Sequence, residues 1–145
     1  MGKYDSLKLE NQLCFPLYAC AKEIVRRYNP LLEEYGLTYT QYIAMMILWD
    51  KGELSVKELG KCLYLDSGTL TPLLKKLEQK GYVERHRGTE DERTLLVHAT
   101  EEGMALRERL LEIPEKVGGC VVLTPEEAKT LYGLLYKVLG GLDES

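Results

Sequence analysis

The middle of the chain has a helix–turn–helix pattern followed by two strand-like segments, and this order constrains the fold more than any other feature. A short amphipathic helix is predicted over 55–63, and a second helix begins near Ser67 and ends at Gly81. The segments 82–87 and 94–98 have strand composition and are joined by a charged loop. Together these segments predict a helix–turn–helix with a β-hairpin.

Helices are predicted on both sides of this central unit. Gly36 closes a first helix, and a second follows from Thr38 or Thr40 to Gly52, with Trp49 near its end. The first helix carries an apolar stripe at helical spacing, formed by Leu13, Leu17, Ile24, Tyr28 and Leu31 or Leu32.

The C-terminal third predicts two more helices. One runs from Thr100 to about Val117 with a kink expected at Pro114. The other begins after Thr124, where a capping Thr, a Pro at the first helical position and a Glu three residues after the cap coincide. Its apolar residues are Leu131, Leu134, Leu135, Val138 and Leu139.

The length of 145 residues suits a single domain, 1–145. The expected fold is mainly α with a small β-hairpin wing: a winged helix-turn-helix lobe over about 54–99, flanked by dimerisation helices in 1–36 and 100–145. Terminal helices with apolar faces and little domain to cover them commonly pair with a second copy by two-fold symmetry. We therefore expect a homodimer.

Charge is distributed unevenly along the chain. The whole chain has a formal charge of −4, but residues 55–93 contain eight Lys and Arg against seven acidic residues, so that the remainder carries −5. The sequence has neither a signal-peptide pattern nor an apolar stretch of spanning length. We expect a cytoplasmic protein without a membrane partner.

The cysteines do not follow metal-binding spacing. Cys14, Cys20, Cys62 and Cys120 form no CxxC pair, and the chain has only two histidines. No metal and no cofactor is expected, and in a reducing compartment the four are thiols. Cys62 is expected to pack in the interior.

The helix that begins at Ser67 is the candidate DNA-reading element. Ser67, Thr69 and Thr71 lie in its first turns, where small polar groups can reach base edges in the major groove. The lysines that follow can neutralise phosphates, without sequence information; they are Lys75, Lys76 and Lys80. From the residues alone, helix caps and a solvated lysine face are an equally good interpretation.

The hairpin loop favours the DNA-binding interpretation. It is too charged to pack internally, and an Arg at the tip of such a loop suits the negative potential of the minor groove. Arg93 is the candidate, and Asp91 could hold its guanidinium in a bidentate pair. An ordinary surface hairpin is the alternative.

Cys14 is the candidate reactive residue. It lies near the start of the first helix, because Pro16 favours a helix start there. The positive end of the helix dipole stabilises a thiolate, which attacks a peroxide oxygen and becomes a sulfenic acid. A quiet packed cysteine is the commoner role and remains the alternative.

Two stretches resemble a known family. Residues 66–103, DSGTLTPLLKKLEQKGYVERHRGTEDERTLLVHATEEG, resemble the winged-helix core of MarR-family regulators, with the DxR motif of the wing at Asp91 and Arg93. Residues 9–42, LENQLCFPLYACAKEIVRRYNPLLEEYGLTYTQY, resemble more narrowly the OhrR branch, which senses organic hydroperoxides.

The resemblance assigns further residues. It implies phenols near the reactive sulfur, which match Tyr18, Tyr28 and Tyr39. Cys14 and Tyr28 are separated by roughly 21 Å of helical rise, so a shared site needs two subunits. OhrR-like proteins have one-cysteine or two-cysteine forms, and Cys120 lies in the region of the second cysteine, which favours the two-cysteine form.

The resulting function is a dimeric repressor that releases operator DNA when an organic hydroperoxide oxidises Cys14, with an intersubunit disulfide to Cys120. One alternative is a MarR-type regulator released by a phenolic or other small ligand. A thiol peroxidase is a less favoured alternative, because no CxxC or reductant-docking element is present. A winged helix that binds proteins is the third.

Overall fold

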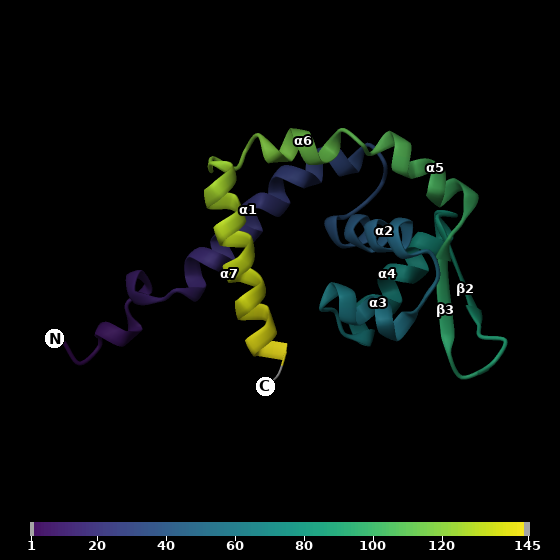
Figure 1. Cartoon of the computed structure of the whole chain (residues 1–145), viewed down its shortest axis with the longest axis horizontal. Coiled ribbons are helices and arrows are strands. Elements are labelled where there is room, and N and C mark those ends of the chain that lie inside the picture. Colours follow the sequence, from purple (N-terminus) through teal and green to yellow (C-terminus); the bar gives the residue numbers. More distant parts are fainter. Residues whose placement is uncertain (1, 144–145) are drawn as a thin grey trace.

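The computed structural model describes residues 2–143, which form seven α-helices, two short 3-10 turns and three strands. In chain order these are η1 (Asp5–Leu7), η2 (Leu9–Asn11), α1 (Cys14–Glu33), α2 (Tyr39–Lys51), β1 (Leu54–Ser55), α3 (Val56–Leu63), α4 (Ser67–Gln79), β2 (Val83–Arg87), β3 (Leu95–Ala99), α5 (Glu101–Arg109), α6 (Ile113–Gly118) and α7 (Pro125–Asp143). Figure 1 shows α2, α3, α4 and the hairpin gathered in one lobe, with α1 and α7 on the other side.

The predicted helix–turn–helix is present as α3 and α4. Ser55 caps α3 in a reciprocal capping box with Glu58, whose N–H donates to the Ser55 hydroxyl at 3.0 Å. Asp66 caps α4 by accepting the N–H of Thr69 at 2.8 Å. Between the helices, Tyr64 adopts a left-handed conformation, which makes the tight turn.

The wing is a three-stranded antiparallel sheet in the order β1–β3–β2. The predicted hairpin is confirmed, with Val83 opposite Ala99 and Arg87 opposite Leu95. The sequence did not predict β1, whose Leu54 pairs with Val97. A strand of two residues is too short to show a period-2 pattern, so only its pairing partner reveals it.

The core surrounds α2 and is built mainly from leucines. Its fully buried side chains include Leu48 of α2, Leu74 and Leu77 of α4, and Val97 of β3. At the end of α2, Trp49 Nε1 donates to the carbonyl of Gly103 at 2.8 Å and ties α2 to α5. Gly103 has no room for a side chain, because a Cβ there would overlap the carbonyl oxygen of Tyr82.

The long helix predicted from Thr100 is two helices. Thr100 caps α5 as expected, but the helix ends at Arg109 and α6 starts at Ile113. Pro114 lies in the first turn of α6, because it has no N–H to donate to the preceding turn and its ring obstructs a continuous helix. The predicted kink is therefore a break.

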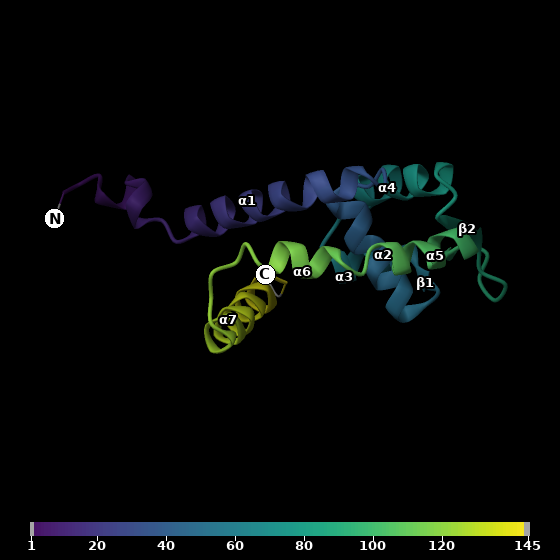
Figure 2. The same cartoon turned by 90° about the horizontal axis from the view of Figure 1, so that it is seen from above.

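The start of the last helix is confirmed. Thr124 and Glu127 form the reciprocal pair of a capping box, with the Glu127 N–H donating to the Thr124 hydroxyl at 3.1 Å. Figure 2 shows α7 leaving the end of α6 and lying apart from α1. Its apolar side chains stay largely open to solvent, with Leu134 55% and Leu131 43% exposed.

Candidate DNA-binding surface and redox site

The recognition helix α4 has one buried and one open face. Its leucines enter the core, whereas Ser67 and Thr69 are exposed in the first turn and Thr71 is half-buried. The hydroxyls of the first turn are thus available to a ligand outside the protein. The hydrogen bond from Thr69 N–H also lowers the pKa of the Asp66 carboxyl, so this cap is an anion.

The three candidate lysines, two in α4 and Lys80 directly after it, do not share one environment. Lys75 and Lys76 are exposed and lie on the open face. Lys80 instead reaches back to the N-terminal part of the lobe, where its Nζ donates to the carbonyl of Gly36 and to Gln41 Oε1. Burial, followed by the charge of Lys76, lowers the pKa of Lys80. Lys80 therefore holds the loop before α2 rather than presenting a free charge to phosphate.

The wing loop presents Arg93 to solvent with its side chain 95% exposed. Asp91 Oδ1 accepts the backbone N–H of Arg93 at 3.0 Å and lies 3.5 Å from its Nε. Asp91 Oδ2 accepts the hydroxyl of Thr94 at 3.3 Å. Asp91 therefore shapes the loop backbone and makes a single contact with the guanidinium, in place of the predicted bidentate pair.

Cys14 is the first residue of α1 and is exposed, as its predicted role at a helix start requires. Tyr18 follows one turn later with 63% exposure. Cys120 lies between α6 and α7, exposed, with its Sγ 3.9 Å from the carbonyl of Lys116. Cys62 is also exposed, so the prediction that it packs in the interior was wrong.

An apolar cavity of about 540 Å³ lies between α1 and α7, next to the start of α1. Leu17, Ala21 and Val25 line it; they lie three, seven and eleven residues after Cys14 and therefore on the same side of α1. The other residues around the cavity are Leu13, Pro16, Cys20, Ile24, Tyr39, Leu131 and Leu135. Cys14 does not line this open, apolar cavity itself; it directly follows Leu13, which does.

Three tyrosines cluster where α1 meets α2. The ring centroids of Tyr28 and Tyr39 are 4.9 Å apart, and that of Tyr42 is 5.7 Å from Tyr28. Burial raises the pKa of all three phenols, that of Tyr42 to about 12 with further contributions from Tyr28 and Tyr39. The structure therefore brings together Tyr28 and Tyr39, as expected, and adds Tyr42, which was not predicted to be part of the site.

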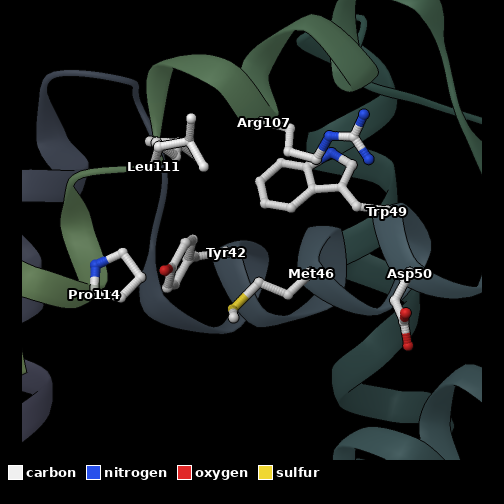
Figure 3. A pocket seen from close by; sticks show the side chains of 8 residues that line it. Tyr42, Met46, Trp49, Asp50, Arg107, Leu111 and Pro114 are labelled. Atoms are coloured by element: carbon white, nitrogen blue, oxygen red, sulfur yellow. The ribbon is translucent and has the colours of Figure 1, made fainter.

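Figure 3 shows a second cavity, of about 380 Å³, between α2 and the α5–α6 segment. Tyr42, Met46 and Trp49 form its α2 side, and Arg107 places a guanidinium beside the indole. Leu111 and Pro114 close the opposite side. Tyr42 therefore connects this cavity to the tyrosine cluster.

The tyrosine cluster makes the free energy of unfolding depend on pH in the alkaline range. The pKa of Tyr42 is raised from 10.0 to about 12 by folding, so the unfolded chain loses this proton first and the stabilisation present below pH 10 is lost as pH rises towards 12. Over this range the wild type should lose on the order of 2 kcal/mol of its free energy of unfolding, and Tyr42→Phe should not show this loss. Denaturant unfolding at successive pH values measures it, and Tyr4→Phe, which removes an exposed phenol, is the control. An unchanged alkaline transition in Tyr42→Phe would contradict the assignment.

Comparison with known proteins identifies a family and relatives that this chain resembles. The family model "Transcriptional regulator SarA/Rot" matches residues 26–110. The organic hydroperoxide resistance transcriptional regulator of Bacillus subtilis is 46% identical over 143 residues, which cover 99% of this chain and 97% of the relative.

Two solved structures of AbfR, a protein of Staphylococcus epidermidis, are similar over nearly the whole chain. Overoxidised AbfR bound to DNA is 34% identical with a TM-score of 0.78, covering 97% of this chain and 99% of that one. Disulfide-formed AbfR is 33% identical with a TM-score of 0.66, covering 94% and 96%.

The Bacillus subtilis relative and the matching family model are both transcriptional regulators, which argues against the thiol-peroxidase alternative. Within residues 2–143 no helix is long and apolar enough to cross a membrane. The winged-helix lobe, the flanking helices and the match over nearly the full length all indicate the same family. The chain belongs to the MarR-type winged-helix transcriptional regulators, in the branch of the organic hydroperoxide resistance regulators (OhrR).

Proposed function

We propose that the protein is a dimeric, cytoplasmic repressor that releases operator DNA when an organic hydroperoxide oxidises Cys14. The observation that carries the proposal is the place of Cys14: it is exposed, at the first position of α1, and directly follows Leu13, which lines the apolar cavity between α1 and α7. A nearby apolar cavity favours alkyl or aryl peroxides over hydrogen peroxide.

The second subunit completes the sensor. Tyr28 lies fourteen residues along α1 from Cys14, so the tyrosine cluster of one protomer is far from its own thiol. The open apolar faces of α1 and α7 give a second copy a large surface to bury. In such a dimer Cys14 and Tyr18 of one protomer face Tyr28 and Tyr39 of the other. Burial raises the pKa of the Tyr28 and Tyr39 phenols further above neutral pH, and as neutral groups they donate hydrogen bonds to the peroxide.

The chemistry proceeds in two balanced steps. The Cys14 thiolate attacks the terminal peroxide oxygen, the O–O bond breaks, and with one proton the products are the sulfenic acid and an alcohol. The thiol of Cys120 from the other subunit then attacks that sulfur, forming a disulfide and releasing water. Cys120 suits this role because it is exposed on the segment between α6 and α7.

The disulfide is the step that releases DNA. It draws two sulfurs to about 2 Å, whereas sulfenic acid formation adds one oxygen atom. The AbfR structures support release at the disulfide step rather than on oxygenation of the sulfur, since an overoxidised form is bound to DNA. The present chain is also closer to that form than to the disulfide form, with TM-scores of 0.78 and 0.66.

DNA contact divides between reading and anchoring. Ser67, Thr69 and Thr71 read base edges, Lys75 and Lys76 contact phosphates, and Arg93, whose loop Asp91 shapes, enters the minor groove. The exposed first turn of α4 and the 95% exposure of Arg93 support this assignment.

A second candidate function is release by a phenolic or other aromatic ligand. The cavity beside Trp49 and Arg107 favours it, because an indole face and a guanidinium suit an aromatic acid. In that case a ligand would release DNA with every thiol intact, and cumene hydroperoxide would have no effect.

Cys14→Ser should abolish the response to peroxide without loss of DNA binding. Serine keeps the shape of the exposed helix start but is not a nucleophile towards peroxides. Duplex binding measured by fluorescence anisotropy, with and without cumene hydroperoxide, tests this. Cys62→Ser, also exposed, is the matched control and should respond as wild type. Release of the Cys14→Ser protein by peroxide would refute the role of Cys14.

Cys120→Ser should separate the two chemical forms. After peroxide treatment, non-reducing electrophoresis of wild type is expected to show a covalent dimer that Cys120→Ser lacks. Intact mass spectrometry of that variant should then show the Cys14 sulfur oxygenated. If wild type stays monomeric on the gel yet still releases DNA, one-cysteine chemistry operates.

Lys75→Ala should weaken binding to all duplexes alike and lower the magnitude of the salt slope, d log K/d log[salt], by about 1 per protomer, because one phosphate contact is lost. Lys116→Ala on α6, which lies away from α4 in Figure 1, is the charge-matched control. Equal slopes for Lys75→Ala and wild type would remove this lysine from the interface.

A further inference from the structure

Both histidines of the chain lie on one face of the wing sheet beside a glutamate. His86 is in β2 and His98 in β3, and they are diagonal neighbours because His86 pairs with Leu96 and Glu84 pairs with His98. Glu53 directly precedes β1, and the antiparallel register of β1 with β3, continued by one residue, sets it opposite His98. Three separate segments thus meet at one point.

Strand alternation turns these side chains away from the core. Val83 and Val97 fill the buried face of the sheet at 2% and 0% exposure. Their neighbours along each strand must point to the opposite face. The imidazole rings of His86 and His98 stand there edge to face with centroids 5.4 Å apart.

The distances from Glu53 to the two histidines match the spacing of ligand atoms around a tetrahedral metal ion. Bonds of about 2.1 Å from Zn²⁺ to nitrogen and oxygen put neighbouring ligand atoms roughly 3.4 Å apart. Glu53 Oε2 is 3.3 Å from His86 Nε2 and 3.6 Å from His98 Nδ1. One ligand atom from each residue lies within 4.8 Å of the others.

His98 gives an independent sign of an absent ligand. Its Nδ1 is buried and has no hydrogen-bond partner among the described residues. The 3.6 Å gap to Glu53 is too long for a hydrogen bond. A buried polar atom without a partner is unusual unless a water or an ion occupies the space next to it.

Glu84 supplies the support that metal-bound histidines need. Its Oε2 lies 3.4 Å from Nε2 of His98, the nitrogen that faces away from Glu53. Histidine ligands usually donate their other N–H to a carboxylate, which fixes the tautomer and the ring. With Nε2–H directed at Glu84, Nδ1 of His98 is left as a lone-pair donor.

We propose that Glu53, His86 and His98 form a binding site for a divalent first-row transition ion of the Zn²⁺ type, with Glu84 as the positioning residue for His98. Two imidazoles and one carboxylate are ligands that zinc accepts, and three protein ligands leave the fourth position for water. The ion would join the turn after α2 to both strands of the wing. The site is separate from the redox site, so the two proposals stand or fall independently.

The two imidazoles allow a direct test in the full-length protein. Long-range ¹⁵N–¹H NMR of the reduced wild-type chain during addition of Zn²⁺ reports each ring nitrogen, even though the exposed thiols also take up metal. The expected result is a joint shift of His86 Nε2 and His98 Nδ1 that saturates. Histidine signals that stay unchanged in excess Zn²⁺ would overturn the site.

Affinity measurements then test the individual roles. In a chain with its four cysteines changed to serine, competition with a chromophoric zinc indicator should give one site per protomer. His98→Gln or His86→Gln should weaken it at least tenfold, and Glu84→Gln by about 10–100-fold. Glu92→Gln, which removes a carboxylate from the same wing, is the control. Circular dichroism confirms folding of each variant, and equal affinity in folded His86→Gln and wild type would overturn the site.

Discussion

The uncovered apolar surface of α1 and α7 is the constraint on which the rest of the molecule depends. The winged-helix lobe buries its own apolar side chains, and leucines of α2 and α4 are fully buried. The flanking helices do not, because α7 leaves nearly all its apolar side chains in contact with solvent. Exposed apolar surface of this extent is typical of an interface. A second copy of the chain is the simplest cover, since MarR-type regulators occur as dimers with two recognition helices.

This constraint also explains why the sensor elements are separated within one chain. A thiol at the start of a twenty-residue helix and a phenol cluster near its end cannot meet in the same protomer. Two antiparallel copies of that helix would place each start beside the other's end. In the proposed function, the packing of these helices would set both the peroxide pocket and the distance between the two wings, and a disulfide between subunits would change that packing.

Local chemistry could be predicted from sequence, and long-range chemistry could not. The capping boxes at Thr124 and Ser55 depend on residues three positions apart, so the helix starts were predicted correctly. The hydrogen bond from Lys80 to Gly36 joins residues forty-four positions apart and was not predicted. The same holds for the candidate site: Cys14 at the start of the first helix was expected, whereas Tyr42 and the Glu53–His86–His98 cluster arise only from helix packing and strand register.

The joint at Gly103 explains how a change near α6 and α7 could reach the wing. Gly103 sits in the first turn of α5 so close to Tyr82 that no side chain fits, and its carbonyl holds the indole of Trp49 at 2.8 Å. Because Tyr82 directly precedes β2, α2, α5 and the wing meet in one tightly packed contact. Tightly packed elements move as units rather than deform. A disulfide that displaces α6 and α7 would therefore swing the lobe through α5 as a rigid body, and the spacing of the two recognition helices would change while each lobe stays folded.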